Sequence, residues 1–374
     1  SCMIRDLDLN DEYPGGHPSD CLGALLAVAP TIGASGEQLV AAVVVSYEII
    51  LAILRSVPLR DIGWDQSIAI GIGAAAGLAN LLHLDHDVVR HAIAITTVAN
   101  TALRATRAGQ LSMWKGAATA YAVRNAVFGV QLASAGMTGP EAPFTGRHGV
   151  VEMISGPFKL PPLGESVSDY RIPDVYTKCW PVAYSLQALV WAGIELRKQV
   201  SPDQLSSVEV LTYAFSMRES GSEPAKWDPR TRETADHSIP YVLARSLLHG
   251  TINHEAFVPE SYLDPSIRPL MSIITVHAND DIEQKIRRGI VEMRLNAKDH
   301  SGRSYHVEII NPLGHEKNPL SPTQIAAKFE DLCAPVLGAT RAAAALRHWS
   351  GIDTATNVKS AFDALNVAVK SGDH

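Results

Sequence analysis

Long apolar segments separated by short polar breaks dominate the first third of the chain. Between positions 22 and 135 they cover residues 39–54, 67–82, 88–98 and 113–135. Alanine-rich, loosely amphipathic segments of this length are typical of helices. Asp87 is a candidate N-cap for the third segment, and Gly136 is a candidate stop after the fourth. Because Ala and Gly are abundant and aromatic residues are few, we expect these helices to pack closely in a bundle.

The pattern changes after this region. Residues 135–172 are rich in Gly and Pro and are predicted to form a long connection. Beyond it, the hydrophobic spacing predicts a helix over 184–199, a strand over 206–213, and a helix over 240–248 that Asp236 or Ser238 could cap. Residues 291–297 and 304–310 alternate apolar and polar positions on either side of a turn, which predicts a β-hairpin.

Helical character returns after the Pro-Leu-Ser-Pro sequence at 319–322 and continues through 340–347. The order of elements is therefore helical, then mixed, then helical. We predict a mainly α protein: a large discontinuous all-α helical domain with an inserted smaller α+β lid domain. The predicted boundaries are 1–174 for the first helical part, 175–314 for the lid, and 315–374 for the return to the helical domain.

Composition and charge narrow the possible functions. The chain of 374 residues has 32 Lys+Arg and 39 Asp+Glu, a formal net charge of −7, and no basic run, which argues against nucleic acid as a partner. The two most apolar segments are short for the ~20 residues of a membrane span, so we expect core helices and no membrane partner. Four scattered cysteines without a CxxC pair exclude a zinc ribbon and a cysteine-ligated iron–sulfur cluster, and they indicate a reducing compartment.

The first candidate site lies near the N-terminus, where Asp8 and other acidic residues precede a Gly-Gly turn and His17-Pro18. Such a turn lets the backbone approach a ligand closely, and a carboxylate near an imidazole supplies an acid/base pair. The alternative is a solvated loop whose acidic residues cap helices. We predict no metal here, because a second imidazole at ligand spacing is missing.

Three cations, Arg104, Arg107 and Lys115, fall between two apolar helices close to a helix start near Ser112. Cations and free backbone N–H groups at a helix start would bind an anionic substrate. The alternative is an ordinary basic loop on the surface. This segment is therefore a candidate site only if the fold turns it toward a cleft.

Two further windows carry candidate ligands. Lys178 and Tyr184 lie where the lid is predicted to begin, and a lysine at such a hinge is a good carboxylate ligand, unless it only extends along the surface. Residues 227–241 combine two arginines, several acids, His237 and a tyrosine in a turn that opens a helix. A charged, capped helix start explains much of this window, and substrate binding is the other interpretation.

Taken together and in order, these windows resemble the MmgE/PrpD family. The segments that carry the resemblance are 8–19, 111–116, 178–181, 232–238 and 314–321. The resemblance implies a large helical domain, a smaller α+β lid, and an active site in the cleft between them. It also implies a homodimer, located in the cytoplasm (or the mitochondrion in a eukaryote), that acts on small polycarboxylates with no metal or other cofactor.

The resemblance implies roles for particular residues. Asp8 and His17 correspond to the acid and imidazole of the family's first site segment, Lys178 to the lid lysine, and His237 to the histidine of the helix-start window. We expect Asp8, His17 and Lys178 to be catalytic. A substrate-binding role is expected for Arg107, Lys115, His237 and Tyr184.

Residues 112–116 and 233–238 are most similar to the 2-methylcitrate dehydratase branch of this family, so the resemblance implies dehydration of 2-methylcitrate. This reaction needs a base, an acid, and cations that stabilise the carboxylate as the C–H bond breaks. Three alternatives remain open. They are decarboxylation of cis-aconitate, epimerisation of iminodisuccinate, and an impaired relative that only binds polycarboxylates.

Overall fold

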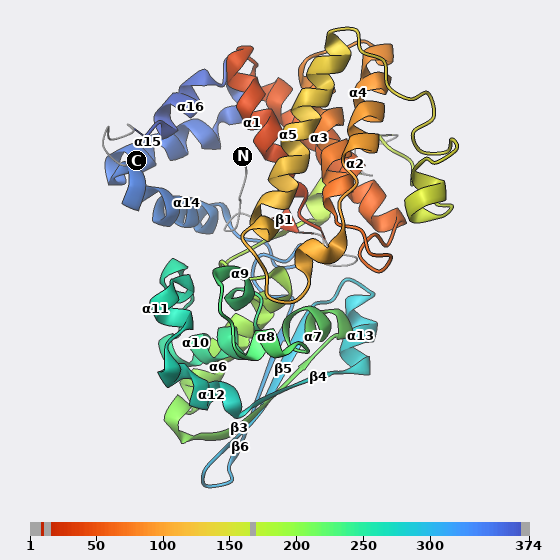
Figure 1. Cartoon of the computed structure of the whole chain (residues 1–374). Helices are drawn as coiled ribbons and strands as arrows, with labels where there is room; N and C mark the ends of the chain where they lie inside the picture. Colours follow the sequence, from red (N-terminus) through yellow and green to blue (C-terminus); the bar gives the residue numbers. More distant parts are fainter. Residues whose placement is uncertain (1–8, 11–15, 165–169, 368–374) are drawn as a thin grey trace.

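Two hydrophobic cores organise the chain. The computed structural model describes residues 9–10, 16–164 and 170–367 of the 374. One core is built from residues 21–133 together with Val358, and the other from residues 176–307. Figure 1 shows the corresponding halves one above the other, with the helices of the first half at the top and the sheet of the second at the bottom. We call them the helical half and the mixed half.

The helical half contains the helices that the apolar segments predict. They are α1 (Leu22–Val28), α2 (Gly36–Ser56), α3 (Ser67–Leu81), α4 (His86–Ala99) and α5 (Trp114–Ser134). A capping box of Ser35 and Gln38 begins α2, where each side chain accepts a hydrogen bond from the other residue's backbone. The predicted cap of α4 is wrong: Asp85 is the N-cap, because its backbone is extended, and Asp87 already lies in the first turn.

Helix α2, with 21 residues, is long and apolar enough to cross a membrane by length and composition alone. Its buried face belongs to the core of the helical half: Tyr47, Ile50 and Leu54 are at most 3% exposed there. The helix packs along α3, whose Gly and Ala residues allow a close approach. The expectation that this segment is a core helix agrees with that packing.

The C-terminal helices return to the helical half. They are α14 (Pro322–Leu337), α15 (Ala339–Ser350) and α16 (Lys359–Leu365), and Figure 1 draws α16 beside α1. Gly36 N–H donates to the Ala355 carbonyl at 2.7 Å, and Val358 N–H donates to the Ala34 carbonyl at 2.9 Å. A Cβ atom on Gly36 would lie 1.5 Å from the Ile352 carbonyl oxygen, so this contact requires glycine. The helical half is therefore discontinuous in sequence.

The mixed half is built on a four-stranded sheet with the order β4-β3-β5-β6. Its strands are β3 (Leu205–Thr212), β4 (Ile274–Ala278), β5 (Glu292–Asp299) and β6 (Ser304–Ile310). The predicted hairpin is confirmed as the antiparallel pair of β5 and β6. The sequence did not predict β4, a five-residue strand parallel to β3 whose residues are mostly exposed or half-buried, so it lacks a buried alternating pattern.

Helices α6 (Gln187–Gln199) and α10 (Ile239–His249) pack together, and α6 also contacts β5 and β6. Ser238 caps α10, because its hydroxyl accepts a hydrogen bond from Tyr241 N–H at 3.1 Å. The remaining short helices of this half are α7 (Ala214–Ser220), α8 (Pro224–Trp227), α9 (Arg232–Ala235), α11 (Pro259–Tyr262), α12 (Arg268–Ser272) and α13 (Asp280–Ile286).

A long segment rich in Gly and Pro leads from the helical half to the mixed half. Residues 135–172 contain a short π-helical turn over Val151–Ser155 and no long element among the described residues, as their composition predicts. The two-residue strands β1 (Leu9–Asn10) and β2 (Tyr176–Thr177) then pair antiparallel. The predicted class, mainly α with a smaller α+β region, is confirmed. The residue boundaries given for the domains stay a prediction.

Candidate active site

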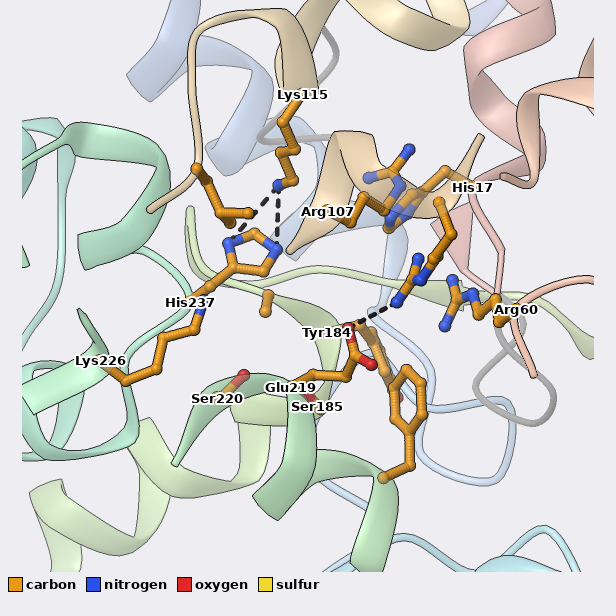
Figure 2. A pocket seen from close by; sticks show the side chains of 14 residues that line it. His17, Arg60, Arg107, Lys115, Tyr184, Ser185, Glu219, Ser220, Lys226 and His237 are labelled. Atoms are coloured by element: carbon orange, nitrogen blue, oxygen red, sulfur yellow. Dashed lines mark hydrogen bonds and ion pairs between the residues drawn. The ribbon is translucent and has the colours of Figure 1, made fainter. Parts of the chain in front are cut away.

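A small cavity of about 60 Å³, which opens into about 600 Å³ of atom-free space that includes solvent, lies between the two halves. The described residues that line it come from the loops and helix starts of the helical half and from α7, α8 and the approach to α6 in the mixed half. They are His17, Arg60, Arg104, Arg107, Leu111, Lys115, Ala183, Tyr184, Ser185, Phe215, Glu219, Ser220, Lys226 and His237. Figure 2 shows Lys115 and His237 facing each other on one side and His17, Arg60 and Arg107 gathered on the other.

Arg107, at the end of the short 3₁₀ helix Arg104–Arg107, is fixed by a buried carboxylate. Its Nε donates to Asp65 Oδ2 at 2.5 Å and its Nη2 to Oδ1 at 3.4 Å. Asp65 is fully buried and also accepts hydrogen bonds from the Ser67 backbone and hydroxyl. Burial alone would raise the pKa of Asp65, but the Arg107 guanidinium and these hydrogen bonds hold that pKa well below its usual range. Asp65 is therefore an ionised anchor for Arg107.

Two more arginines complete this wall. Arg104 of the helical half donates to Glu219 of α7 at 2.5 Å, so this ion pair joins the two halves. Arg60 follows α2, lies over the Phe215 ring at 5.1 Å, and donates to Gln66 at 3.3 Å. Burial, followed by repulsion from the two neighbouring arginines, lowers the pKa of Arg60 to about 10, which leaves it cationic at neutral pH. We call Arg60, Arg104 and Arg107 the arginine wall.

A chain of hydrogen bonds forms the opposite side of the cavity. Lys115, in the first turn of α5, lies with Nζ 2.9 Å from His237 Nε2, and His237 Nδ1 is hydrogen-bonded to Asp236. Since an ionised carboxylate accepts hydrogen bonds, Nδ1 carries the proton and Nε2 accepts from Lys115. Burial, followed by the charge of Lys115, lowers the pKa of His237 to about 3 despite Asp236. His237 is therefore a neutral imidazole with its lone pair directed at Lys115.

The cavity has a positive lining. Among the described residues that line it, five carry cationic side chains and one, Glu219, carries a carboxylate. A locally positive, partly enclosed cleft attracts anions even though the whole chain has a net charge of −7. The lining predicts an anionic ligand with more than one negative charge.

The structure brings most of the sequence-predicted site residues together. Those that line the cavity are His17, Arg107, Lys115, Tyr184 and His237. Lys178 is buried, at 5% exposure, but is not among the residues that line this cavity. Asp8 lies outside the described residues. The roles that the sequence assigned to these seven residues stay predictions.

Sequence reasoning missed several lining residues, above all Arg60, Glu219 and Lys226. Lys226 lies one position before the window that was singled out, on the four-residue helix α8, and it is almost fully buried. Its sequence neighbourhood has no spacing that distinguishes it from a surface lysine. Burial lowers the pKa of Lys226, and nearby carboxylates oppose that shift. Only the packing of α8 against the cavity identifies this residue.

The described residues contain no group of three or more His, Cys, Asp or Glu side chains that could hold a metal ion. The polar side chains that line the cavity are mostly cationic donors. Such a donor set fits carboxylates rather than a divalent cation.

Two histidines make folding sensitive to acid. His315 is fully buried against the Tyr176 ring, and burial followed by the charge of Lys317 lowers its pKa to about 4. Burial also lowers the pKa of His237, to about 3. Both pKa values lie below the ~6.5 of an unfolded histidine, so the unfolded chain binds protons first as the pH falls. We expect each histidine to lower the free energy of unfolding by about 2 kcal/mol between pH 7.5 and pH 5.

Urea unfolding at the two pH values measures this loss. His315→Gln is expected to remove about half of it, whereas His86→Gln, at a side chain that is 87% exposed, is expected to leave it unchanged. Equal stability of the wild-type chain at pH 7.5 and pH 5 would contradict the prediction.

Comparison with known proteins identifies the family of the chain. Residues 1–162 match the MmgE/PrpD N-terminal domain, and residues 180–350 match the MmgE/PrpD C-terminal domain. These two matches cover most of the chain, which therefore belongs to the MmgE/PrpD family. The resemblance seen in the sequence is confirmed.

Three relatives of this chain are named 2-methylcitrate dehydratase. The chain is 27% identical over 300 residues to a 2-methylcitrate dehydratase of Cupriavidus necator, covering 73% of this chain and 60% of the relative. It is 25% identical over 345 residues to the 2-methylcitrate dehydratase of Salmonella typhi, covering 85% and 70%. A mitochondrial 2-methylcitrate dehydratase of Yarrowia lipolytica is 25% identical over 295 residues, covering 72% and 55%. The chain thus spans between about half and 70% of the length of these relatives.

Proposed function

We propose that the chain is a hydro-lyase of the MmgE/PrpD type that acts on a small polycarboxylate and removes water from 2-methylcitrate to give 2-methylaconitate. The observation that carries the proposal is the cavity between the two halves, in which five cations and a neutral imidazole meet with one carboxylate among the described lining residues. The relatives named 2-methylcitrate dehydratase support the choice of substrate.

The arginine wall binds the carboxylates of the substrate. Guanidinium groups donate to carboxylates in a paired geometry, and Arg107 is held in place for this by Asp65. When the base removes the proton next to a carboxylate, negative charge builds up on that carboxylate. Cations fixed beforehand in a partly enclosed site stabilise this charge without having to move.

His237 accepts that proton. A neutral imidazole is a base, and the Nδ1 hydrogen bond to Asp236 stabilises the cation that forms. In the free protein, Lys115 Nζ donates a hydrogen bond to His237 Nε2 at 2.9 Å. A substrate carboxylate that pairs with Lys115 frees this lone pair, and its negative charge also raises the pKa of His237. Substrate binding thus prepares the base.

The second half of the reaction breaks the C–O bond. The electron pair of the broken C–H bond forms the C=C bond, and the hydroxyl group leaves with a proton as water. His17 lies on the side of the arginine wall (Figure 2) and donates this proton. The family resemblance adds Asp8 as its partner and Lys178 as a further catalytic cation, although Lys178 is not among the described residues that line the cavity. These three assignments come from the family resemblance.

The proposal extends to the setting of the enzyme. It includes a homodimer, a cytoplasmic location or a mitochondrial one in a eukaryote, and no cofactor. Metal ions, nucleic acid and membranes are not partners in it. These points rest on the sequence and on the family resemblance.

Purified protein mixed with 2-methylcitrate is expected to produce a conjugated alkene, detected by its ultraviolet absorption and by mass spectrometry of the product. The same assay is run with citrate, cis-aconitate and iminodisuccinate. Dialysis against a chelator is expected to leave the rate unchanged, since no step uses a metal.

Three outcomes would contradict the proposal. Release of carbon dioxide from cis-aconitate, without alkene formation from 2-methylcitrate, would identify a decarboxylase. Interconversion of iminodisuccinate stereoisomers would identify an epimerase. Binding of polycarboxylates, measured by thermal shift, without turnover of any of them would identify a binding protein.

A further inference from the structure

Lys226 is the cation of the cavity that comes from the mixed half. It lies on α8, its side chain is 2% exposed, and it lines the cavity. Within the part of the chain that the structure describes, its ammonium group forms no hydrogen bond or ion pair. The carboxylates of Glu219, Glu223 and Asp236 favour the charged lysine from a distance, but among the described residues none pairs with it directly. A buried ammonium group with no direct partner can therefore bind an anion that enters the cavity.

A second polar group without a partner lies on the same wall. Ser220, the last residue of α7, is fully buried and lines the cavity, and its hydroxyl makes no hydrogen bond. The neighbouring Glu219 is already engaged by Arg104 at 2.5 Å. Figure 2 shows Ser220 in the lower part of the view, between Lys226 and Glu219. A hydroxyl and an ammonium group, neither of which has a direct partner among the described residues, are thus both available as donors to a carboxylate in the cavity.

The other cations differ from Lys226 because each has a protein partner. Arg107 is paired with Asp65, Arg104 with Glu219, Arg60 with Gln66, and Lys115 with His237. The arginine wall and Lys115 belong to the helical half, and Lys226 faces them from the mixed half. A ligand with several carboxylates can contact both sides at once, whereas a ligand with two can satisfy both on the helical side.

We propose that Lys226, assisted by Ser220, binds one carboxylate of the substrate opposite the arginine wall and thereby selects tricarboxylates over dicarboxylates. This assignment rests on the proposed function, because it presupposes a polycarboxylate in the cavity. It makes Lys226 a specificity-determining residue that holds the substrate across the two halves.

Calorimetric binding of two unreactive acids tests this role. The tricarboxylate is tricarballylate, and the dicarboxylate is glutarate, which has the same main chain without the central carboxylate. Lys226→Met keeps the buried stem and removes the charge. We expect the Kd for tricarballylate to rise by about 10- to 100-fold, as for loss of a hydrogen bond to a charged group, and the Kd for glutarate to change much less. Ser220→Ala is expected to raise the tricarballylate Kd by a smaller factor.

The matched control is Lys198→Met, on α6 of the same half, where the side chain is 64% exposed and pairs with Glu195. It is expected to leave both Kd values unchanged. Circular dichroism verifies folding, and Lys226→Gln replaces Lys226→Met if that variant does not fold. An equal rise in the Kd of both acids would show that Lys226 acts only through its general charge. An unchanged Kd for tricarballylate would show that Lys226 does not contact a carboxylate of the ligand. Either result, or a wild-type protein that binds neither acid, overturns the inference.

These outcomes are separate from the test of the function. Alkene formation by the wild-type enzyme together with unchanged binding in Lys226→Met would leave the hydro-lyase proposal intact and remove only the role of Lys226. Selective loss of tricarballylate binding in a protein that turns over none of the acids would support the subsite and contradict the hydro-lyase.

Discussion

Replacement of His237 with glutamine is expected to lower kcat for 2-methylcitrate dehydration by about 10²- to 10⁴-fold, the range for loss of a general base. Glutamine retains a hydrogen-bonding group beside Lys115 and Asp236 but cannot take up the proton. The loss is expected in kcat rather than in KM, because the carboxylates of the substrate are held by the cations. Steady-state kinetics of the folded variant measure both constants.

A second readout separates a base from a merely structural residue. If His237 removes the substrate proton, the wild-type enzyme exchanges that hydrogen with deuterium from the solvent, and His237→Gln does not. His249→Gln, at an exposed position in the last turn of α10, is the matched control and is expected to keep the wild-type rate. A His237→Gln variant that retains exchange and at least a tenth of kcat would exclude the residue as the base.

Replacement of Arg107 with methionine is expected to lower the free energy of unfolding by about 3–5 kcal/mol, the range for breaking a buried ion pair from one side. Asp65 is fully buried and ionised, and its main cationic partner is Arg107 at 2.5 Å. Without the guanidinium, the carboxylate must stay charged in a buried site or take up a proton. Urea unfolding at neutral pH measures the loss.

The double variant Arg107→Met/Asp65→Asn tests the cause. Removing both charges is expected to recover part of the lost stability, so the two substitutions are not additive. Arg90→Met removes an exposed partner of Asp87 and is expected to change the free energy of unfolding by less than about 1 kcal/mol. A fully additive double variant would show that the pair is not the source of the loss. The free energy of unfolding that remains in Arg107→Met also shows whether a lower activity of this variant is due to weaker substrate binding or to partial unfolding.

The pH dependence of this ion pair has the same sign as that of the histidines, but it falls in a lower pH range. The pKa of Asp65 is lower in the folded chain than in the unfolded one, so its contribution is present above the unfolded pKa of about 3.9 and is lost as the pH falls below it. The loss expected between pH 7.5 and pH 5 therefore comes from His237 and His315, and acid-induced loss of the Asp65 contribution follows only at lower pH.

Much of the fold follows from the sequence, because local patterns carry it. The apolar segments are long enough to form α2, α3 and α5, and the two alternating segments around a turn form β5 and β6. Hydrophobic periodicity is a property of neighbouring positions, so it can be read without knowing the tertiary structure. Short elements such as α8 and β4 could not be predicted, because they have too few residues to show a hydrophobic period.

Part of the candidate site was predicted from charged residues near helix starts rather than from hydrophobic periodicity. Charged residues concentrated near helix starts identified Arg107, Lys115 and His237, and the structure brings all three to one cavity. Their states could not be predicted in this way. The low pKa of His237 depends on burial and on Lys115, which is 122 positions away in the sequence.

The sequence by itself determined the helical segments, the hairpin, the family and the presence of clustered cations, since each depends on residue type and local spacing. The tertiary structure alone decided that Lys226 and Arg60 face the same cavity, that Asp65 fixes Arg107, and that Lys178 lies outside the lining. The physical reason is that burial and the charges of distant segments set the chemistry of a side chain, and both arise only when the two halves pack together.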